Sequence, residues 1–145
     1  MLQSDSRVAL QSVSWVSLPL PPGFLPVGVV VSGMETVELA ERDVVEAVDG
    51  VYLAQLAVGD SMSVQHFHIE PGADVPAHDH HHEQAGFVYK GVLTFDVEGE
   101  EHVVTAGESY TIPGGETHGA VNDGDEHVRG VDVFYPAREN PDWQA

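Results

Sequence analysis

The residues of this sequence that are best suited to chemistry are histidines in two short segments. His78 and His80 lie in residues 72–91, and His118 lies in residues 107–122. Neutral imidazole is a common ligand of divalent transition metals. His78 and His80 are two residues apart, so on a β-strand their side chains would leave the same face and could converge on one cation. With His118 arriving from a separate strand, the spacing predicts one metal site built from both segments.

The composition limits which metals such a site could bind. The chain has no cysteine, which excludes disulfides, thiolate zinc sites and cysteine nucleophiles. Histidine, carboxylate and amide groups remain as ligands, and they suit hard or borderline cations. We therefore expect one divalent transition metal, and the same ligands accept manganese, iron, nickel, cobalt or zinc according to supply.

Short β-strands must position these histidines. Residues 34–145 consist mainly of short runs rich in Val, Tyr, Phe and Thr, separated by Gly, Pro and Asp turn signals. Many short strands at regular spacing predict an all-β antiparallel sandwich or barrel. Glu35–Val48 fits either a short helix or a strand. The expected strands are Val51–Val58, Met62–Ile69, Gly86–Val97, His102–Thr105, Ser109–Ile112, His118–Val121 and His127–Phe134.

The surface is expected to be strongly acidic, because the 145 residues include 24 acids and only five Lys and Arg, a formal net charge of −19. Phosphate contacts need a basic surface, so nucleic acid is excluded as a partner. This lysine-poor composition is typical of halophilic cytoplasmic proteins, whose self-repulsion is screened by salt. An acidic mesophilic protein is the alternative. No run resembles a signal peptide or is long enough to span a membrane, so we expect a cytoplasmic protein.

The composition changes abruptly at Met34. Residues 1–33 hold one acid and one base, whereas the other 23 acidic residues all follow Met34. We interpret residues 1–33 as an N-terminal extension that is weakly ordered or non-native, with Met34 as the natural start. The alternative is that Val27–Val31 forms a strand that pairs with the barrel or with a partner subunit. Residues 34–145 are expected to form a single domain of ordinary size.

Around its histidines the chain resembles the cupin family. One family motif spaces Gly, His-x-His, an acid or amide ligand and Gly, and a second spaces Gly, Pro-x-Gly, His and Asn. The chain agrees with both at every position. The resemblance implies a double-stranded β-helix, or jelly-roll barrel, with a metal site inside, over residues 34–145. The matching residues are Gly72, His78, His80, Gln84 and Gly91, then Gly107, Pro113, Gly115, His118 and Asn122.

The chain departs from the usual cupin pattern at the fourth ligand, where Gln84 stands in place of a glutamate. Gln84 is four residues beyond His80, an even spacing that keeps both on one strand face, whereas Glu83 would point away. An uncharged amide leaves the charge of the cation uncompensated, which favours polarising a carbonyl or stabilising an enolate over productive oxygen binding. The implied metal ligands are His78, His80, Gln84 and His118.

The end of the last expected strand narrows the resemblance to cupins that open 4,5-unsaturated uronates into linear keto sugars. That subgroup has Asp-x-Phe followed by an Arg, and this chain has Asp132, Phe134 and Arg138. The resemblance implies that Asp132 moves protons, that Phe134 shapes the pocket wall and that Arg138 holds the uronate carboxylate. A closely similar C-terminal sequence occurs in uncharacterised cupins of halophiles, so membership of the subgroup does not identify the substrate.

These observations predict a metal-dependent cupin isomerase that isomerises or ring-opens a small acidic sugar, with a small anionic metabolite as its partner. Two alternatives remain open. One is a cupin dioxygenase that uses iron or copper, and the other is a non-catalytic cupin that binds a small molecule. Exposed edge strands of an open sheet pair readily with a second subunit, so we expect a homodimer.

The other histidines of the expected strands and loops have less specific roles. His82 has the right parity for a ligand, but the motif spacing favours a loop position for both His81 and His82. His66 and His68 share one strand face. They either contact the substrate or make ordinary hydrogen bonds, and the second interpretation is preferred.

Aromatic residues of the expected strands fit core positions better than a cofactor site. Tyr110 lies where a strand and the pocket could meet, and a phenol near a metal can act as a base, but core packing is the preferred interpretation. Core positions are therefore expected for Phe87, Tyr89, Phe95 and Tyr110, and surface positions for His102 and His127.

Overall fold

The computed structural model describes residues 33–144, and the all-β prediction for this part of the chain is confirmed. Helical structure within residues 33–144 is limited to two 3-10 turns, η1 (Leu39–Glu41) and η2 (Asp142–Gln144). No helix in this range is long and apolar enough to cross a bilayer. The predictions for residues 1–32, an extension or a strand at Val27–Val31, lie outside the described residues.

Ten strands make up the barrel. They are β1 (Val45–Val48), β2 (Val51–Val58), β3 (Ser63–Ile69), β4 (Asp74–His78), β5 (Glu83–Lys90), β6 (Val92–Val97), β7 (Glu100–Thr105), β8 (Ser109–Ile112), β9 (His118–Val121) and β10 (Val128–Tyr135).

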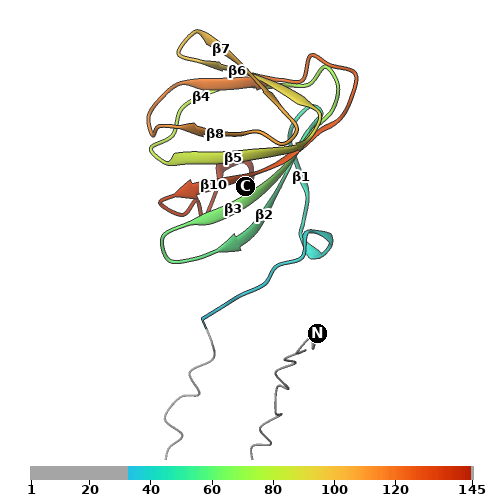
Figure 1. The fold of residues 1–145 in the computed structure, drawn as a ribbon. Coiled ribbons are helices and arrows are strands. Elements are labelled where there is room, and N and C mark those ends of the chain that lie inside the picture. The colour runs from blue at the N-terminus through green and yellow to red at the C-terminus, as the bar shows by residue number, and fades with distance from the viewer. Residues whose placement is uncertain (1–32, 145) are drawn as a thin grey trace, which may run out of the picture. The chain divides into compact units, whose positions relative to one another are not determined.

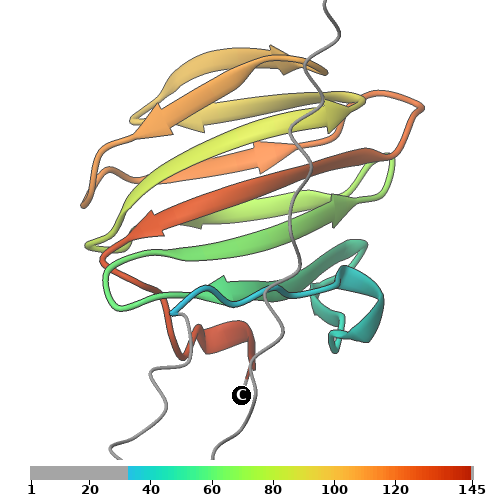
Figure 2. The ribbon, with the colours of Figure 1, turned by 60° about the horizontal axis from the view of Figure 1, so that its bottom comes forward.

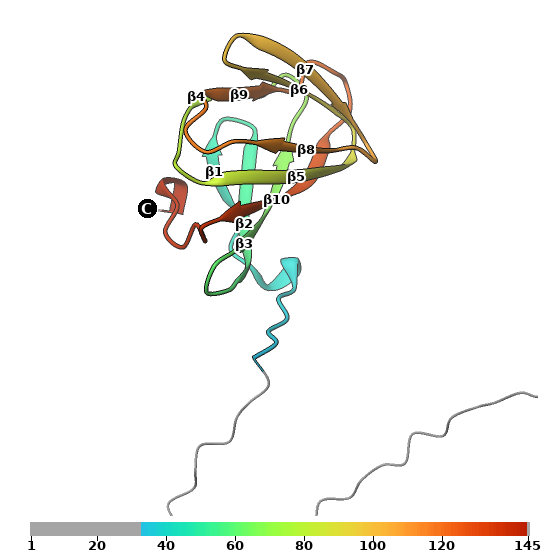
Figure 3. The same ribbon diagram turned by 60° about the vertical axis from the view of Figure 1, so that its left-hand side comes forward.

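The strands form two antiparallel sheets that face each other (Figure 1, Figure 3). One sheet has six strands in the order β1-β2-β3-β10-β5-β8, and the other has four in the order β4-β9-β6-β7. Strands that are distant in sequence lie side by side, since β10 runs between β3 and β5 (Figure 2). This arrangement is the expected jelly-roll barrel.

Apart from shifts of one or two residues at strand ends, the strands differ from the sequence-based prediction in three places. Gly86–Val97 is not one strand, because the chain reverses at Gly91, whose φ of +81° lies in the left-handed region that favours glycine. The unpredicted β4 contains Pro76, which a sheet tolerates because β4 is an edge strand. Glu35–Val48, which fitted either helix or strand, contains both η1 and β1.

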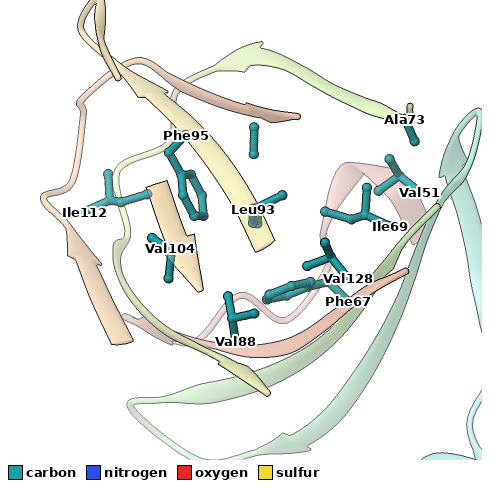
Figure 4. Close-up of a cluster of buried hydrophobic side chains, with 11 residues drawn as sticks. Val51, Phe67, Ile69, Ala73, Val88, Leu93, Phe95, Val104, Ile112 and Val128 are labelled. Atoms are coloured by element: carbon teal, nitrogen blue, oxygen red, sulfur yellow. The ribbon is translucent and has the colours of Figure 1, made fainter. Parts of the chain in front are cut away.

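Inward-facing side chains of both sheets meet in a hydrophobic core (Figure 4). Phe95 is buried in it and Tyr110 packs against it, as predicted. Phe87 and Tyr89 were expected there as well, but they are 42% and 47% exposed. Alternation on β5 explains the error, because Val88 and the other even-numbered residues up to it point inward, so their odd-numbered neighbours point out.

Candidate metal centre

Three histidines meet at one end of the barrel interior. His78 ends β4, His118 begins β9, and the two residues are partners across the sheet. His80 lies in the loop between β4 and β5. One ring nitrogen from each histidine lies within 4.8 Å of the other two. The two sequence segments therefore converge on one point, as their spacing predicts.

A loop places His80 at this point, and strand alternation does not. β4 ends at His78, and residues 79–82 turn toward β5, so His78 and His80 do not share a strand face. The main-chain N–H of Gly115 donates a hydrogen bond of 2.8 Å to the carbonyl of His80. Gly115 adopts a φ of +83°, in the left-handed region open to glycine. The Pro-x-Gly of the second segment thus holds the loop that carries His80.

Main-chain carbonyls orient all three imidazole rings. The Nδ1 atoms of His78, His80 and His118 lie 2.8, 3.1 and 2.8 Å from the carbonyl oxygens of Pro76, His82 and Glu116, respectively. A carbonyl oxygen can only accept a hydrogen bond, so Nδ1 carries the proton in each ring. In the neutral imidazole, Nε2 is then the nitrogen with a free lone pair. The three lone pairs available to a cation are therefore those of Nε2.

Burial keeps two of these rings neutral. It lowers the pKa of His80 to about 4, with the positive charge of Arg138 adding to the effect. Burial also lowers the pKa of His118. Nε2 of His118 is buried and has no hydrogen-bond partner within residues 33–144. A buried lone pair without a partner costs free energy, and a bound cation would satisfy it.

Gln84, the second residue of β5, places its amide beside the histidines. Its side chain is 6% exposed, whereas Glu83 points to solvent. The amide N–H₂ lies near the carboxylate of Asp132 and lowers the pKa of that group. The opposite amide atom, Oε1, lies 3.2 Å from Nε2 of His80. Two acceptors therefore face each other, because the unprotonated Nε2 cannot donate to Oε1.

This arrangement fits a divalent transition metal. One nitrogen from each of three histidines lies within 4.8 Å of the others, Oε1 of Gln84 lies 3.2 Å from Nε2 of His80, and Nε2 of His118 is buried without a hydrogen-bond partner within residues 33–144. Carbonyls that orient ligand histidines are a regular feature of protein metal sites. His78, His80, His118 and Gln84 are the residues that would hold the ion.

A buried carboxyl group, Asp132 of β10, lies next to these donors. The hydroxyl of Tyr110 on β8 donates a hydrogen bond of 2.5 Å to Oδ1 of Asp132. Burial raises the pKa of Asp132 to about 6, although the hydrogen bonds from Tyr110 and Gln84 act in the opposite direction. Burial and the charge of Asp132 raise the pKa of Tyr110, so the phenol stays protonated. Asp132 is thus a buried carboxyl group whose pKa is raised and which lies next to the candidate metal ligands.

Gly86 makes the contact between Tyr110 and Asp132 possible. It is their neighbour on β5, the strand that separates β8 from β10. A Cβ atom at this position would collide with the phenol of Tyr110 and with the carboxylate of Asp132. The expected core packing of Tyr110 is therefore only part of its role, because Tyr110 also contacts Asp132. Gly86, which leaves room for this contact, was the residue in the sequence that could have indicated it.

Phe134 and Arg138 complete this end of the interior. The ring of Phe134 lies edge-on to His80, with 5.6 Å between centroids. The guanidinium carbon of Arg138 lies 5.3 Å from the Phe134 ring centroid. Arg138 also donates a hydrogen bond of 2.9 Å to Asp142, whose side chain is 93% exposed. Such an exposed ion pair contributes little stability, so an anionic ligand could replace Asp142 on Arg138.

These groups line a cavity of about 390 Å³ in the barrel. Sequence reasoning did not identify two of its lining residues, Gln65 and Trp143. The indole N–H of Trp143, in η2, donates a hydrogen bond of 3.1 Å to Oε1 of Gln65. Gln65 is the cross-strand partner of Asp132 and faces the interior with it. The C-terminal segment therefore forms part of the cavity wall.

The remaining histidines of the two segments and of β3 do not join the metal cluster. His82 is in the loop after β4, as predicted, and its carbonyl orients His80. His66 and His68 lie on the outer face of β3, since Gln65 and Phe67 face the cavity. His66 pairs with the hydroxyl of Tyr89 at 2.7 Å, and His68 pairs with His127 at 2.7 Å. Ordinary hydrogen bonds therefore account for both.

Comparison with known proteins gives one family match and a short match to a named enzyme. Residues 65–134 match the family described as Cupin domain. A protein of Bacillus subtilis named H2HPP isomerase is 33% identical over 69 residues, which is 48% of this chain and 29% of that protein. The chain thus spans less than a third of that relative's length.

Solved structures are similar over a longer stretch. The structure of KdgF from Halomonas sp. has a TM-score of 0.68 at 24% identity, covering 74% of this chain and 97% of that one. An RmlC-like cupin from Shewanella frigidimarina has a TM-score of 0.66 at 26% identity, covering 74% and 95%. Both have the fold described above.

Proposed function

Because this chain belongs to the cupin family, we propose that its cavity is the active site of a metal-dependent isomerase that moves a proton within a small anionic carbonyl compound. The 4,5-unsaturated uronate predicted from the sequence is the first such substrate to assay. The name of the Bacillus subtilis relative, an isomerase, supports this reaction class over oxygen chemistry.

One observation carries the proposal. The carboxyl of Asp132 is buried in the cavity wall, has its pKa raised to about 6, and is linked through the amide of Gln84 to the histidine cluster. A group that exchanges its proton near neutral pH is suited to general acid and base catalysis. Binding alone would not need a titratable carboxyl at this place.

The residues divide the work of the reaction by position. Arg138 pairs with the substrate carboxylate in place of the exposed Asp142. A metal held by the histidines and Gln84 would supply Lewis acidity toward the substrate carbonyl. Tyr110 fixes the carboxylate of Asp132 through its hydrogen bond. Phe134 closes the wall beside His80 and keeps water from that side.

Asp132 accepts one proton and returns one proton, so the reaction needs no oxidant or reductant. With the unsaturated uronate, the C1 hydroxyl loses its proton to Asp132 and the bond from C1 to the ring oxygen breaks. The C1 carbonyl forms, and the ring oxygen takes the bond pair and becomes the oxygen of an enolate at C5. C4 then receives a proton, which leaves a ketone at C5. Product and substrate have the same composition.

The test is an assay of the metal-loaded protein with 4,5-unsaturated uronate, monitored by loss of the ultraviolet absorbance of the double bond. Manganese, iron, nickel, cobalt and zinc are loaded in turn. A rate above the enzyme-free background with at least one metal supports the proposal. A background rate with all five removes the uronate as a substrate. An oxygen electrode in the same cell should record no consumption, and consumption would favour a dioxygenase.

A further inference from the structure

The cavity has an apolar end and a polar end. The pairing of β3 with β10 shows where the lining changes from one kind to the other. Inward-facing residues of β10 are paired with inward-facing residues of β3 along the length of the barrel. The pairs change from apolar to polar toward the end that carries the histidines. In that order they are Val128 with Ile69, Gly130 with Phe67, and Asp132 with Gln65.

The apolar end offers a ligand no hydrogen bond from a side chain. Both sheets contribute to it, and Figure 4 shows Val51, Phe67 and Ile69 of one sheet and Leu93 and Phe95 of the other around the same interior. Their main-chain groups are used in the ladders between strands. The lining residues at this end include Val51, Leu53, Phe67, Ile69, Leu93 and Phe95.

The polar end has the opposite character. His78, His118, Gln84, Asp132 and Arg138 all line the same cavity and are gathered at this one end. They suit a carboxylate and a carbonyl oxygen. One molecule that fills the cavity must therefore present a charged head to this end and a different group to the other.

We infer that the substrate is an acid whose other end is a hydrocarbon ring or chain, and not a fully hydroxylated sugar acid. A hydroxyl group at the apolar end would lose its water without gaining a partner, which is unfavourable. A hydrocarbon group there gains from leaving water. The orientation of the head rests on the proposed function, whereas the character of the tail rests on the cavity wall. The unsaturated uronate would then be the poorer substrate.

The experiment compares two acids with the metal-loaded protein. Phenylpyruvate has an apolar ring, and galacturonate is a hydroxylated acid of similar size. Isothermal titration measures each Kd. Proton NMR in D₂O follows deuterium incorporation at the carbon next to the phenylpyruvate carbonyl, where a proton leaves and a solvent deuteron returns. We expect phenylpyruvate to bind at least about tenfold more tightly than galacturonate.

Leu53 provides the matched variants. It is half-buried on β2 and lines the cavity away from the histidines. Leu53→Asn should remove most of the preference for phenylpyruvate, whereas Leu53→Ala keeps the wall apolar and should retain it. Val103→Asn makes the same polar change at a residue that is exposed on β7 and should alter neither Kd. Thermal melts of each variant confirm that it is folded.

The outcomes separate this inference from the proposed function. If galacturonate binds as tightly as phenylpyruvate, or more tightly, the inference is overturned, whichever compound reacts. If phenylpyruvate binds more tightly but neither it nor the unsaturated uronate is turned over, the inference stands and the isomerase proposal fails. Tighter binding together with exchange of the phenylpyruvate proton supports both.

Discussion

The two ends of the barrel interior are built by the same strands from different kinds of side chain. On β3, Gln65 faces the polar end and Phe67, two residues later, faces the apolar end. On β10, Asp132 likewise faces the polar end and Gly130 faces the apolar end. A Cβ atom at Gly130 would collide with the ring of Phe67, so only glycine fits there. Alternation decides which residues point inward, and position along the strand decides their chemistry.

This contrast teaches that metal chemistry and stability depend on separate parts of one interior. Substitutions at the polar end should change metal binding and turnover with little effect on folding. Substitutions at the apolar end should change folding with little effect on the metal. Five predictions test this separation, from the largest expected effect to the smallest.

His118→Ala should abolish turnover. Loss of a ligand should weaken metal binding by at least as much as the roughly 100-fold that removal of an orienting partner costs. The free energy of unfolding of the metal-free protein should change little, because loss of the hydrogen bond between Nδ1 and the Glu116 carbonyl is offset by removal of a buried nitrogen without a partner. Metal content after dialysis and urea unfolding provide the two readouts. His102→Ala, at an exposed histidine on β7, is the control, and equal metal content in both variants would contradict the site.

Asp132→Asn should reduce kcat by about 10²–10⁴-fold while metal content is unchanged. In the unchanged protein, kcat should rise with pH around a midpoint at or below about 6, because the ionised carboxylate accepts the proton. The variant should lose this dependence. Asp125→Asn, at an exposed acid, is the control. Equal activity in the Asp132 variant would remove this residue from the mechanism.

The same carboxyl makes a prediction for stability. The folded-state pKa of Asp132 is raised above its ordinary value of 3.8, so the folded protein holds this proton more tightly than the unfolded chain does. The stabilisation is complete below about pH 4 and is lost as pH rises through about 6. Urea unfolding of the metal-free protein at several pH values, with and without Asp132→Asn, isolates this contribution.

Phe67→Ala should lower the free energy of unfolding by about 3–5 kcal/mol, because it leaves a cavity in the apolar end. Metal affinity should change by less than the uncertainty of the titration. Urea unfolding and metal titration measure the two quantities. Phe87→Ala, on the outer face of β5, is the control and should cost much less. A large loss of metal affinity in the Phe67 variant would show that the two ends are not independent.

Asp142→Asn should have the smallest effect. Its ion pair with Arg138 is exposed, so the free energy of unfolding should change by no more than about 1 kcal/mol. The KM for an anionic substrate should fall, because the variant removes a carboxylate that competes for Arg138. Steady-state kinetics test this expectation. A rise in KM would mean that Asp142 holds Arg138 in position.

The spacing of residues within the two segments was sufficient to predict the histidine cluster, because the turns that carry these segments have recognisable glycine and proline residues. It was not sufficient for Tyr110 and Asp132, which are 22 residues apart and belong to strands on either side of β5. Trp143 was missed because a short C-terminal segment carries no periodic signal. The inward position of Gln84 was predicted correctly, although His80 and Gln84 are not on one strand as supposed.

The facing lone pairs of His80 and Gln84 make the folded protein sensitive to its metal supply. Without an ion, folding brings together acceptors that water would otherwise satisfy. An ion that binds only the folded state removes this penalty and adds stability that grows with the logarithm of its free concentration. The melting temperature would then report occupancy directly, and a series of melts in buffered metal solutions would rank the ions by affinity before any substrate is known.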